Sequence, residues 1–206
     1  MPESYYPSPW DEVPVLPVVV PLGLLVFAAL LWQLRRRAAL TLPRAVVCAV
    51  VSVYVAGVVA NSLFPIFIGK PSGLSEWWEV PYLTPLVGYE ARDMLENVEV
   101  FVPLGVLLPL VARVTSLPRV VVYGFLISLT IELLQWVNAV TVQGGHAPDI
   151  NDLLFNTVGT PIGYGLFRIA LLLPVLRRLA RSATWPLPRP DLADTPAASE
   201  EASTRG

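Results

Sequence analysis

Apolar residues in this chain gather in five long stretches, which run over about residues 13–34, 45–68, 94–114, 119–142 and 150–176. Each is close to or longer than the roughly 20 residues that a helix needs to cross a bilayer. Polar, proline-containing or charged segments separate them. The pattern predicts an all-α fold, a polytopic integral membrane bundle of about five transmembrane helices.

The stretches divide the chain into three expected parts. Residues 1–12 form an extracytoplasmic N-terminal segment, residues 13–181 a transmembrane domain, and residues 182–206 a cytoplasmic tail. No Lys or Arg precedes the first stretch, unlike in a signal peptide, so it is expected to be a retained span. Pro, Ala, Ser and Glu dominate the tail, which predicts disorder.

Basic residues are found at alternate ends of the expected spans, and cytoplasmic loops of membrane proteins are rich in Lys and Arg. Nine arginines fall on one side: Arg35, Arg36, Arg37, Arg44, Arg113, Arg119, Arg177, Arg178 and Arg181. The loops of the other side hold only Lys70 and Arg92. This predicts a multi-pass protein of the cell membrane with its N-terminus outside and its C-terminus in the cytoplasm. Trp77 and Trp78, in an outer loop, are expected at the membrane interface.

Composition supports a membrane protein and excludes other classes. Hydrophobic residues make up 54% of the chain and charged residues 15%, whereas soluble domains carry about 25% charged residues. Membrane lipids are therefore expected partners. With 14 Lys and Arg against 16 Asp and Glu there is no basic excess, and no nucleic-acid partner is expected. The single cysteine, Cys48, excludes an intramolecular disulfide.

Polar residues inside the fourth stretch are the first candidates for chemistry. Ser128, Glu132 and Gln135 are spaced i, i+4, i+7 and share one helical face. Glu132 is expected near the middle of the membrane, where an ionisable group costs on the order of 2.5 kcal/mol or more and faces the bundle interior. Two interpretations stay open: a structural hydrogen-bonding group, or part of a site.

The third and fifth stretches also begin with polar residues at the expected outer end. Asp149 fits a helix N-cap, and Gly159 with Gly163 forms a spacing that lets another helix approach closely. Because polar groups facing lipid would be unsatisfied, we expect one outward-opening pocket. Its candidate binding residues are Glu96, Asn97, Glu132, Gln135, His146, Asp149, Asp152 and Asn156. With one histidine and no nearby cysteine, neither a metal nor an organic cofactor is expected; an all-oxygen site of Glu96, Glu132, Asp149 and Asp152 stays geometrically conceivable.

Three strings occur in order on successive stretches: ENVEVFVPLGVLLP, IELLQ and PDINDLLFNTVGTPIGYGL. Together they resemble the VanZ-like family of small membrane proteins, over about residues 61–165. The resemblance identifies residues 13–181 as a VanZ-like transmembrane domain, and it implies a cell-envelope protein connected with resistance to glycopeptide antibiotics of the teicoplanin type. His146 stands where relatives often have an arginine.

These residues and the family resemblance point to three candidate functions. The first is a non-enzymatic envelope protein that modulates sensitivity to teicoplanin-like glycopeptides through an outer-leaflet polar pocket, with lipid-linked cell-wall material or the glycopeptide itself as ligand. The alternative is a membrane-embedded enzyme acting on a lipid-linked or cell-wall substrate, with Glu132 and Asp152 as acid–base groups. A transporter is disfavoured, since no inverted repeat is detectable. Whether the protein is an enzyme stays open.

Overall fold

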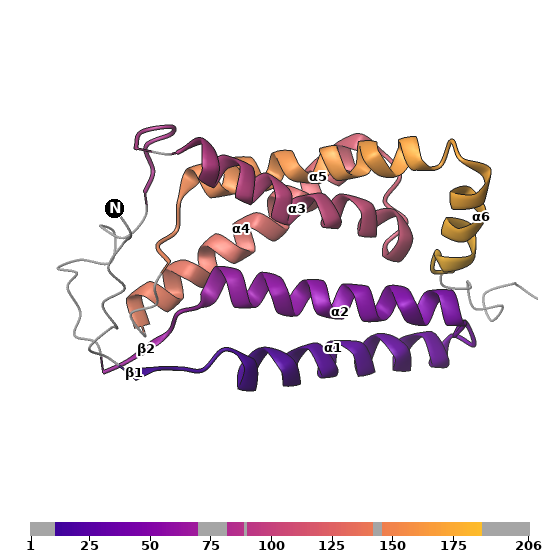
Figure 1. The fold of residues 1–206 in the computed structure, drawn as a ribbon, viewed down its shortest axis with the longest axis horizontal. Helices are drawn as coiled ribbons and strands as arrows, with labels where there is room; N and C mark the ends of the chain where they lie inside the picture. Colours follow the sequence, from indigo (N-terminus) through magenta and orange to yellow (C-terminus); the bar gives the residue numbers. More distant parts are fainter. Residues whose placement is uncertain (1–10, 70–81, 89, 142–145, 187–206) are drawn as a thin grey trace, which may run out of the picture.

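The computed structural model describes residues 11–69, 82–88, 90–141 and 146–186. Within these ranges the chain is an elongated bundle of helices (Figure 1). Helices α1 (Leu16–Arg36), α2 (Leu42–Leu63), α3 (Ala91–Val111) and α4 (Leu117–Thr141) are each long and apolar enough to cross a membrane. Helix α5 (Ile150–Ala170) meets that criterion together with α6 (Pro174–Ala183), to which it is bent by 119°. The expected all-α membrane bundle with about five spans is confirmed.

Two helices, α2 and α5, end earlier than the sequence predicts, and a proline lies shortly after each end. The expected second span continues to residue 68, but α2 ends at Leu63 because Phe64 precedes Pro65, and a residue before proline avoids the helical region. The expected fifth span continues to residue 176, but α5 ends at Ala170 and the chain turns before a new helix starts at Pro174. Proline is favoured in the first turn of a helix. Both expected boundaries are therefore wrong at their C-terminal ends.

Helices α3, α4 and α5 form a closely packed group, with α3 and α5 in the most extensive contact. Glycine makes that contact possible. A Cβ atom on Gly159 would lie 2.3 Å from the Val98 carbonyl oxygen, and one on Gly163 would lie 1.9 Å from the Val102 carbonyl oxygen. The close helix approach expected from the two glycines is confirmed, and the approaching helix is α3.

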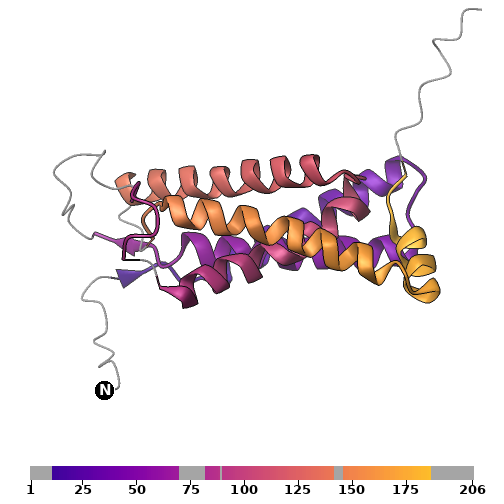
Figure 2. The same ribbon diagram turned by 90° about the horizontal axis from the view of Figure 1, so that it is seen from above.

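Helices α1 and α2 form a hairpin that lies beside this group (Figures 1 and 2). The last carbonyls of a helix have no partner within the helix, and α4 supplies partners for two of them. The side-chain amide of Gln135 donates to the Ser62 carbonyl at 3.0 Å, and that of Asn138 donates to the Leu63 carbonyl at 2.9 Å. These bonds join one end of the hairpin to the main group.

The other end of the hairpin is joined through the chain that follows α6. Arg44 Nε donates to the Thr184 carbonyl at 3.0 Å, and the Trp185 amide donates to the Leu110 carbonyl at 2.8 Å. The Trp185 side chain is buried against Leu34 and Cys48. Ordered structure thus continues past the expected boundary at residue 181. The rest of the expected tail and Trp77 and Trp78 lie outside the described residues.

The two ends of the bundle differ in character. The α1–α2 and α3–α4 connections and α6 lie together at one end, so the nine arginines counted above gather there (Figure 1). At the opposite end, β1 (Asp11–Glu12) pairs antiparallel with β2 (Phe67–Ile68). The starts of α3 and α5 lie at this second end, which is where the candidate residues were expected.

Candidate functional site

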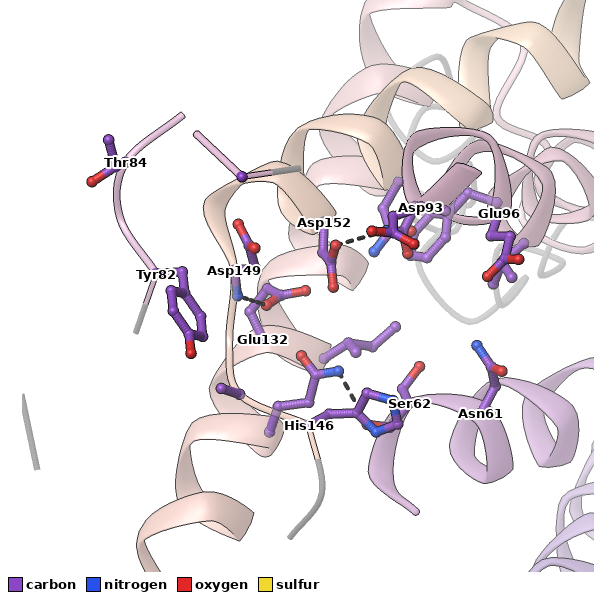
Figure 3. Close-up of a pocket in the computed structure, with 18 of the residues that line it drawn as sticks. Asn61, Ser62, Tyr82, Thr84, Asp93, Glu96, Glu132, His146, Asp149 and Asp152 are labelled. Atoms are coloured by element: carbon purple, nitrogen blue, oxygen red, sulfur yellow. Dashed lines mark hydrogen bonds between the residues drawn. The ribbon is translucent and has the colours of Figure 1, made fainter. Parts of the chain in front are cut away.

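A cavity of about 850 Å³, whose lining residues are drawn in Figure 3, lies at the end of the bundle opposite the nine clustered arginines. It lies between the C-terminal parts of α2 and α4, the N-terminal parts of α3 and α5, and residues of the 82–88 loop. All eight candidate residues line it: Glu96, Asn97, Glu132, Gln135, His146, Asp149, Asp152 and Asn156. The structure brings together side chains from three expected spans; that they bind a ligand remains a prediction. We call this cavity the acidic chamber.

Glu132 holds the connection between α4 and α5 inside the bundle. Its Oε2 accepts a hydrogen bond of 2.8 Å from the backbone amide of Asp149 (Figure 3). Asp149 therefore lies at the level of Glu132, which precedes the end of α4 by nine residues, or about 13 Å of helix. The chain after α4 returns into the bundle before α5 begins. The side chain of Glu132 is buried, and so are those of Ser128 and Gln135 on the same face.

A second link joins α3 to α5. The Asn97 side-chain amide donates to Asp152 Oδ1 at 2.7 Å (Figure 3). Both side chains are partly buried, so the bond is shielded from solvent. It holds the Asp152 carboxylate in the wall of the acidic chamber, one turn before the buried Asn156.

Asp149 and Asn151 hold the 82–88 loop over the chamber. Asp149 Oδ1 accepts from the Asn151 backbone amide at 2.7 Å, so Asp149 is the N-cap of α5 as expected. Asn151 is 1% exposed, and its Oδ1 accepts from the Leu86 amide at 2.8 Å. Tyr82 forms a parallel bridge to Asp149 and exchanges backbone hydrogen bonds with Pro148 and Ile150. The loop is thereby fixed to the start of α5.

Three buried acceptor oxygens at the chamber have no hydrogen-bond partner among the described residues: Glu132 Oε1, Gln135 Oε1 and Asn156 Oδ1. Native proteins rarely leave buried polar atoms unsatisfied, because each costs desolvation energy. The three residues come from α4 and α5 and all line the same cavity. Their oxygens are therefore available to water or to a ligand that carries N–H or O–H donors.

The charges that line the chamber are mainly negative. The carboxyl groups belong to Asp93, Glu96, Glu132, Asp149 and Asp152. Among the lining residues that the structure describes, the one basic side chain is His146, which is exposed at the rim. Glu96 is also on the rim, in a 2.7 Å ion pair with Arg92. Among the described residues, no group of three or more His, Cys, Asp and Glu could hold a metal ion, so the conceivable all-oxygen set does not form there.

Sequence reasoning did not identify Asn151, two residues at the end of α2, or the 82–88 loop as contributors to the chamber. Asn151 lies between two candidate aspartates, but nothing in the sequence shows that its side chain bonds to a loop 65 residues away. Asn61 and Ser62, at the end of α2, line the chamber because α4 holds that end in place. The Tyr82–Gly88 loop has no hydrophobic periodicity that would place it. Its position at the chamber is set only by its contacts with the start of α5.

Comparison of the sequence with known proteins identifies the family to which the chain belongs. A family model described as VanZ/LLP1 matches residues 58–172, which include α3, α4, α5 and all the candidate residues. A curated relative, Protein VanZ of Enterococcus faecium, is 34% identical over 80 residues. That match covers 38% of this chain and 46% of the relative, so the chain spans about half the length of the relative it matches. No solved structure matches significantly. The matched region includes every residue that lines the acidic chamber. Because the family model covers more than half of the chain, this protein belongs to the VanZ/LLP1 family.

Proposed function

We propose that this protein works at the outer half of the cell membrane and modulates sensitivity to glycopeptide-type antibiotics, of which teicoplanin is the type, through the acidic chamber. The observation that carries the proposal is the gathering of all eight candidate residues around one cavity, at the end of the bundle away from the arginines. Family membership supports the antibiotic role.

The orientation of the proposal rests on charge. Arginine-rich ends of membrane proteins face the cytoplasm, so the chamber end would face outward, with the N-terminus outside and the C-terminus inside. In this orientation a ligand reaches the chamber from the outer leaflet. Lipid-linked cell-wall material and the glycopeptide itself are the ligands we expect there.

Deletion and complementation in the native host test the role. We expect the deletion strain to be more susceptible to teicoplanin and wild-type protein to restore the original susceptibility. Copies carrying Glu132→Ala or Asp152→Ala should fail to restore it, while a copy carrying Val50→Ala, on the exposed face of α2, should succeed. Unchanged susceptibility on deletion would reject the antibiotic role. Full restoration by both chamber variants would reject the chamber and leave the role standing.

An enzymatic role is the second candidate, because Glu132 and Asp152 lie in the same cavity and both are held by hydrogen bonds from neighbouring segments. In that role one group would donate a proton to a lipid-linked or cell-wall substrate and the other would accept one. Glu132→Gln separates the two candidates. Glutamine keeps an acceptor for the Asp149 amide but cannot transfer a proton, so complementation survives in the binding role and is lost in the enzymatic one.

A further inference from the structure

A second cavity, of about 350 Å³, lies between α2 and the pair α3 and α4. Its lining is almost entirely hydrocarbon and includes Val55, Val58, Leu104, Leu107, Ile127 and Ile131. Its rim is exposed at Ala112 and Thr130. We call this cavity the apolar seam. Its volume and that of the acidic chamber both fall in the range of about 300–1,000 Å³ typical of small-molecule sites.

The seam adjoins the chamber on the side toward the arginine-rich end. Ile131 lines both cavities. On each of the three helices a seam residue lies one turn beyond a chamber residue. The pairs are Val58 and Ser62 on α2, Leu104 and Val100 on α3, and Ile127 and Ile131 on α4. Residues one turn apart share a helical face. A polar compartment at one end therefore adjoins an apolar compartment on the same faces of the same helices.

The packing of the two helix pairs explains why the seam exists. Helices α3 and α5 meet through glycines with backbone against backbone. Helix α2 instead contacts α3 through the long side chain of Tyr54, whose hydroxyl donates to the Val100 carbonyl at 3.1 Å. The hairpin is thus held away from the bundle in the middle while hydrogen bonds hold it close at both ends.

The chamber selects the polar part of an occupant by charge and by hydrogen bonding. Carboxylates attract cations and repel phosphate. The free Glu132 Oε1, Gln135 Oε1 and Asn156 Oδ1 are acceptors that require donors. A phosphate supplies acceptors and negative charge, whereas an amine with neighbouring hydroxyl or amide groups supplies what these oxygens lack.

We propose that the chamber and the seam together bind one amphiphile, with an amine-bearing, donor-rich headgroup in the chamber and a single hydrocarbon chain in the seam. This inference rests on the outer-leaflet chamber of the proposed function and names the class of its ligand. The chain follows from the seam's apolar lining, and the headgroup from the carboxyl groups and free acceptors. Because Ile131 lines both cavities, a headgroup in the chamber and a hydrocarbon chain in the seam would lie close enough to belong to one molecule.

Native mass spectrometry of the full-length protein in phosphatidylcholine nanodiscs tests the ligand class. The probes are hexadecylamine, hexadecyl phosphate with the same chain, and butylamine, which has the amine without the chain. We expect one hexadecylamine per protein, with binding of the other two weaker by at least about tenfold. Equal binding of hexadecyl phosphate would overturn the headgroup assignment, and equal binding of butylamine would overturn the role of the chain.

Variants locate the binding. Val58→Trp fills the seam from α2, and Thr130→Trp fills it from the rim on α4. Because Thr130 is exposed, Thr130→Trp should fold even if Val58→Trp does not. Both should weaken hexadecylamine binding by about tenfold or more, while the control Val50→Trp, on α2 outside the seam, should not. Glu132→Ala, which removes both carboxyl oxygens, should also weaken hexadecylamine binding, and it should narrow the difference in affinity between hexadecylamine and hexadecyl phosphate. Unweakened binding in a folded seam variant would overturn the proposal.

The antibiotic test separates this inference from the proposed function. If hexadecylamine fails to bind while deletion still raises teicoplanin susceptibility and chamber variants fail to complement, the ligand class is wrong and the proposed function stands. If hexadecylamine binds as described while deletion changes nothing, the ligand class stands and the antibiotic role is rejected.

Discussion

At the scale of single residues, Glu132 has two oxygens with different surroundings. Oε2 accepts from the Asp149 amide, and Oε1 is buried without a partner at the chamber wall. The first oxygen keeps the chain before α5 inside the bundle, and the second is offered to the cavity. The hydrogen bond of Oε2 supports the structural interpretation of this residue. The functional interpretation rests on Oε1 and remains a prediction.

Two substitutions of Glu132 should reveal how much its hydrogen bond to the Asp149 amide contributes to the stability of the protein. Glu132→Ala leaves the Asp149 amide without its acceptor, which costs about 1–3 kcal/mol of stability. Glu132→Gln keeps an acceptor and should cost clearly less. Thermal unfolding of purified protein in one detergent measures the difference, and equal losses in both variants would contradict the role of the Asp149 hydrogen bond.

The hydrogen bond from Asn97 to Asp152 should couple α3 to α5 energetically. A double-mutant cycle of Asn97→Ala and Asp152→Ala should give a coupling free energy of about 0.6 kcal/mol, up to about 1.7, as found for side-chain bonds between membrane helices. Unfolding of the wild type, both single variants and the double variant measures it. Strictly additive losses would show that the bond contributes no stability.

At the scale of helices, small residues and prolines decide how the elements meet. Glycines 105, 159 and 163 allow α3 and α5 to touch through their backbones, and this contact brings the polar starts of both helices to one cavity. Proline ends α2 early enough for its last carbonyls to bond with α4. The chamber therefore depends on packing well outside its own walls.

Two glycines on α5 form a matched pair for testing this contact. A Cβ on Gly163 would lie 1.9 Å from the Val102 carbonyl oxygen, whereas one on Gly165 would meet nothing within 4 Å. Gly163→Ala should destabilise the protein by about 1–3 kcal/mol through overpacking. Gly165→Ala should be neutral or stabilising by up to about 1 kcal/mol through helix propensity.

Thermal unfolding in detergent compares the two variants under the same conditions. Loss of complementation by Gly163→Ala, with retention by Gly165→Ala, would connect the α3–α5 contact to the proposed function. Equal thermal stability of the two variants would contradict a close backbone contact between α3 and α5 at Gly163.

At the scale of the whole molecule, the nine clustered arginines and the acidic chamber lie at opposite ends of the bundle. Charge asymmetry of this kind orients membrane proteins during insertion. The bent helix α6 carries three of the arginines, and its bend of 119° from α5 is compatible with a position along the membrane surface. The proposed outward opening of the chamber depends on this asymmetry.

Cysteine accessibility tests the orientation directly. In a Cys48→Ala background, Thr84→Cys at the chamber end and Ser116→Cys at the arginine-rich end are both exposed positions. A membrane-impermeant maleimide applied to intact cells should label the first and not the second. Labelling of Ser116→Cys alone would invert the topology, and labelling of both would contradict a single orientation.

The sequence by itself determined the apolar stretches, the cluster of arginines at alternate ends, the Asp149 cap and the shared face of Ser128, Glu132 and Gln135. These follow from composition and from helical periodicity, which act over a few neighbouring residues. It also determined the candidate residues, because polar groups cannot face lipid. Local patterns are sufficient for such features.

Only the tertiary structure decided which polar groups meet. Three such contacts join segments far apart in the sequence. Glu132 accepts from the backbone amide of Asp149, 17 residues away, and Asn151 accepts from the amide of Leu86, 65 residues away. Tyr54 donates to the carbonyl of Val100, 46 residues away, and so holds the seam open. Helical periodicity gives the face of a residue but not the depth or rotation of its helix against the next one. Those are set by the glycine contacts and by where proline ends each helix, so the chamber and the seam exist only once all the helices have packed.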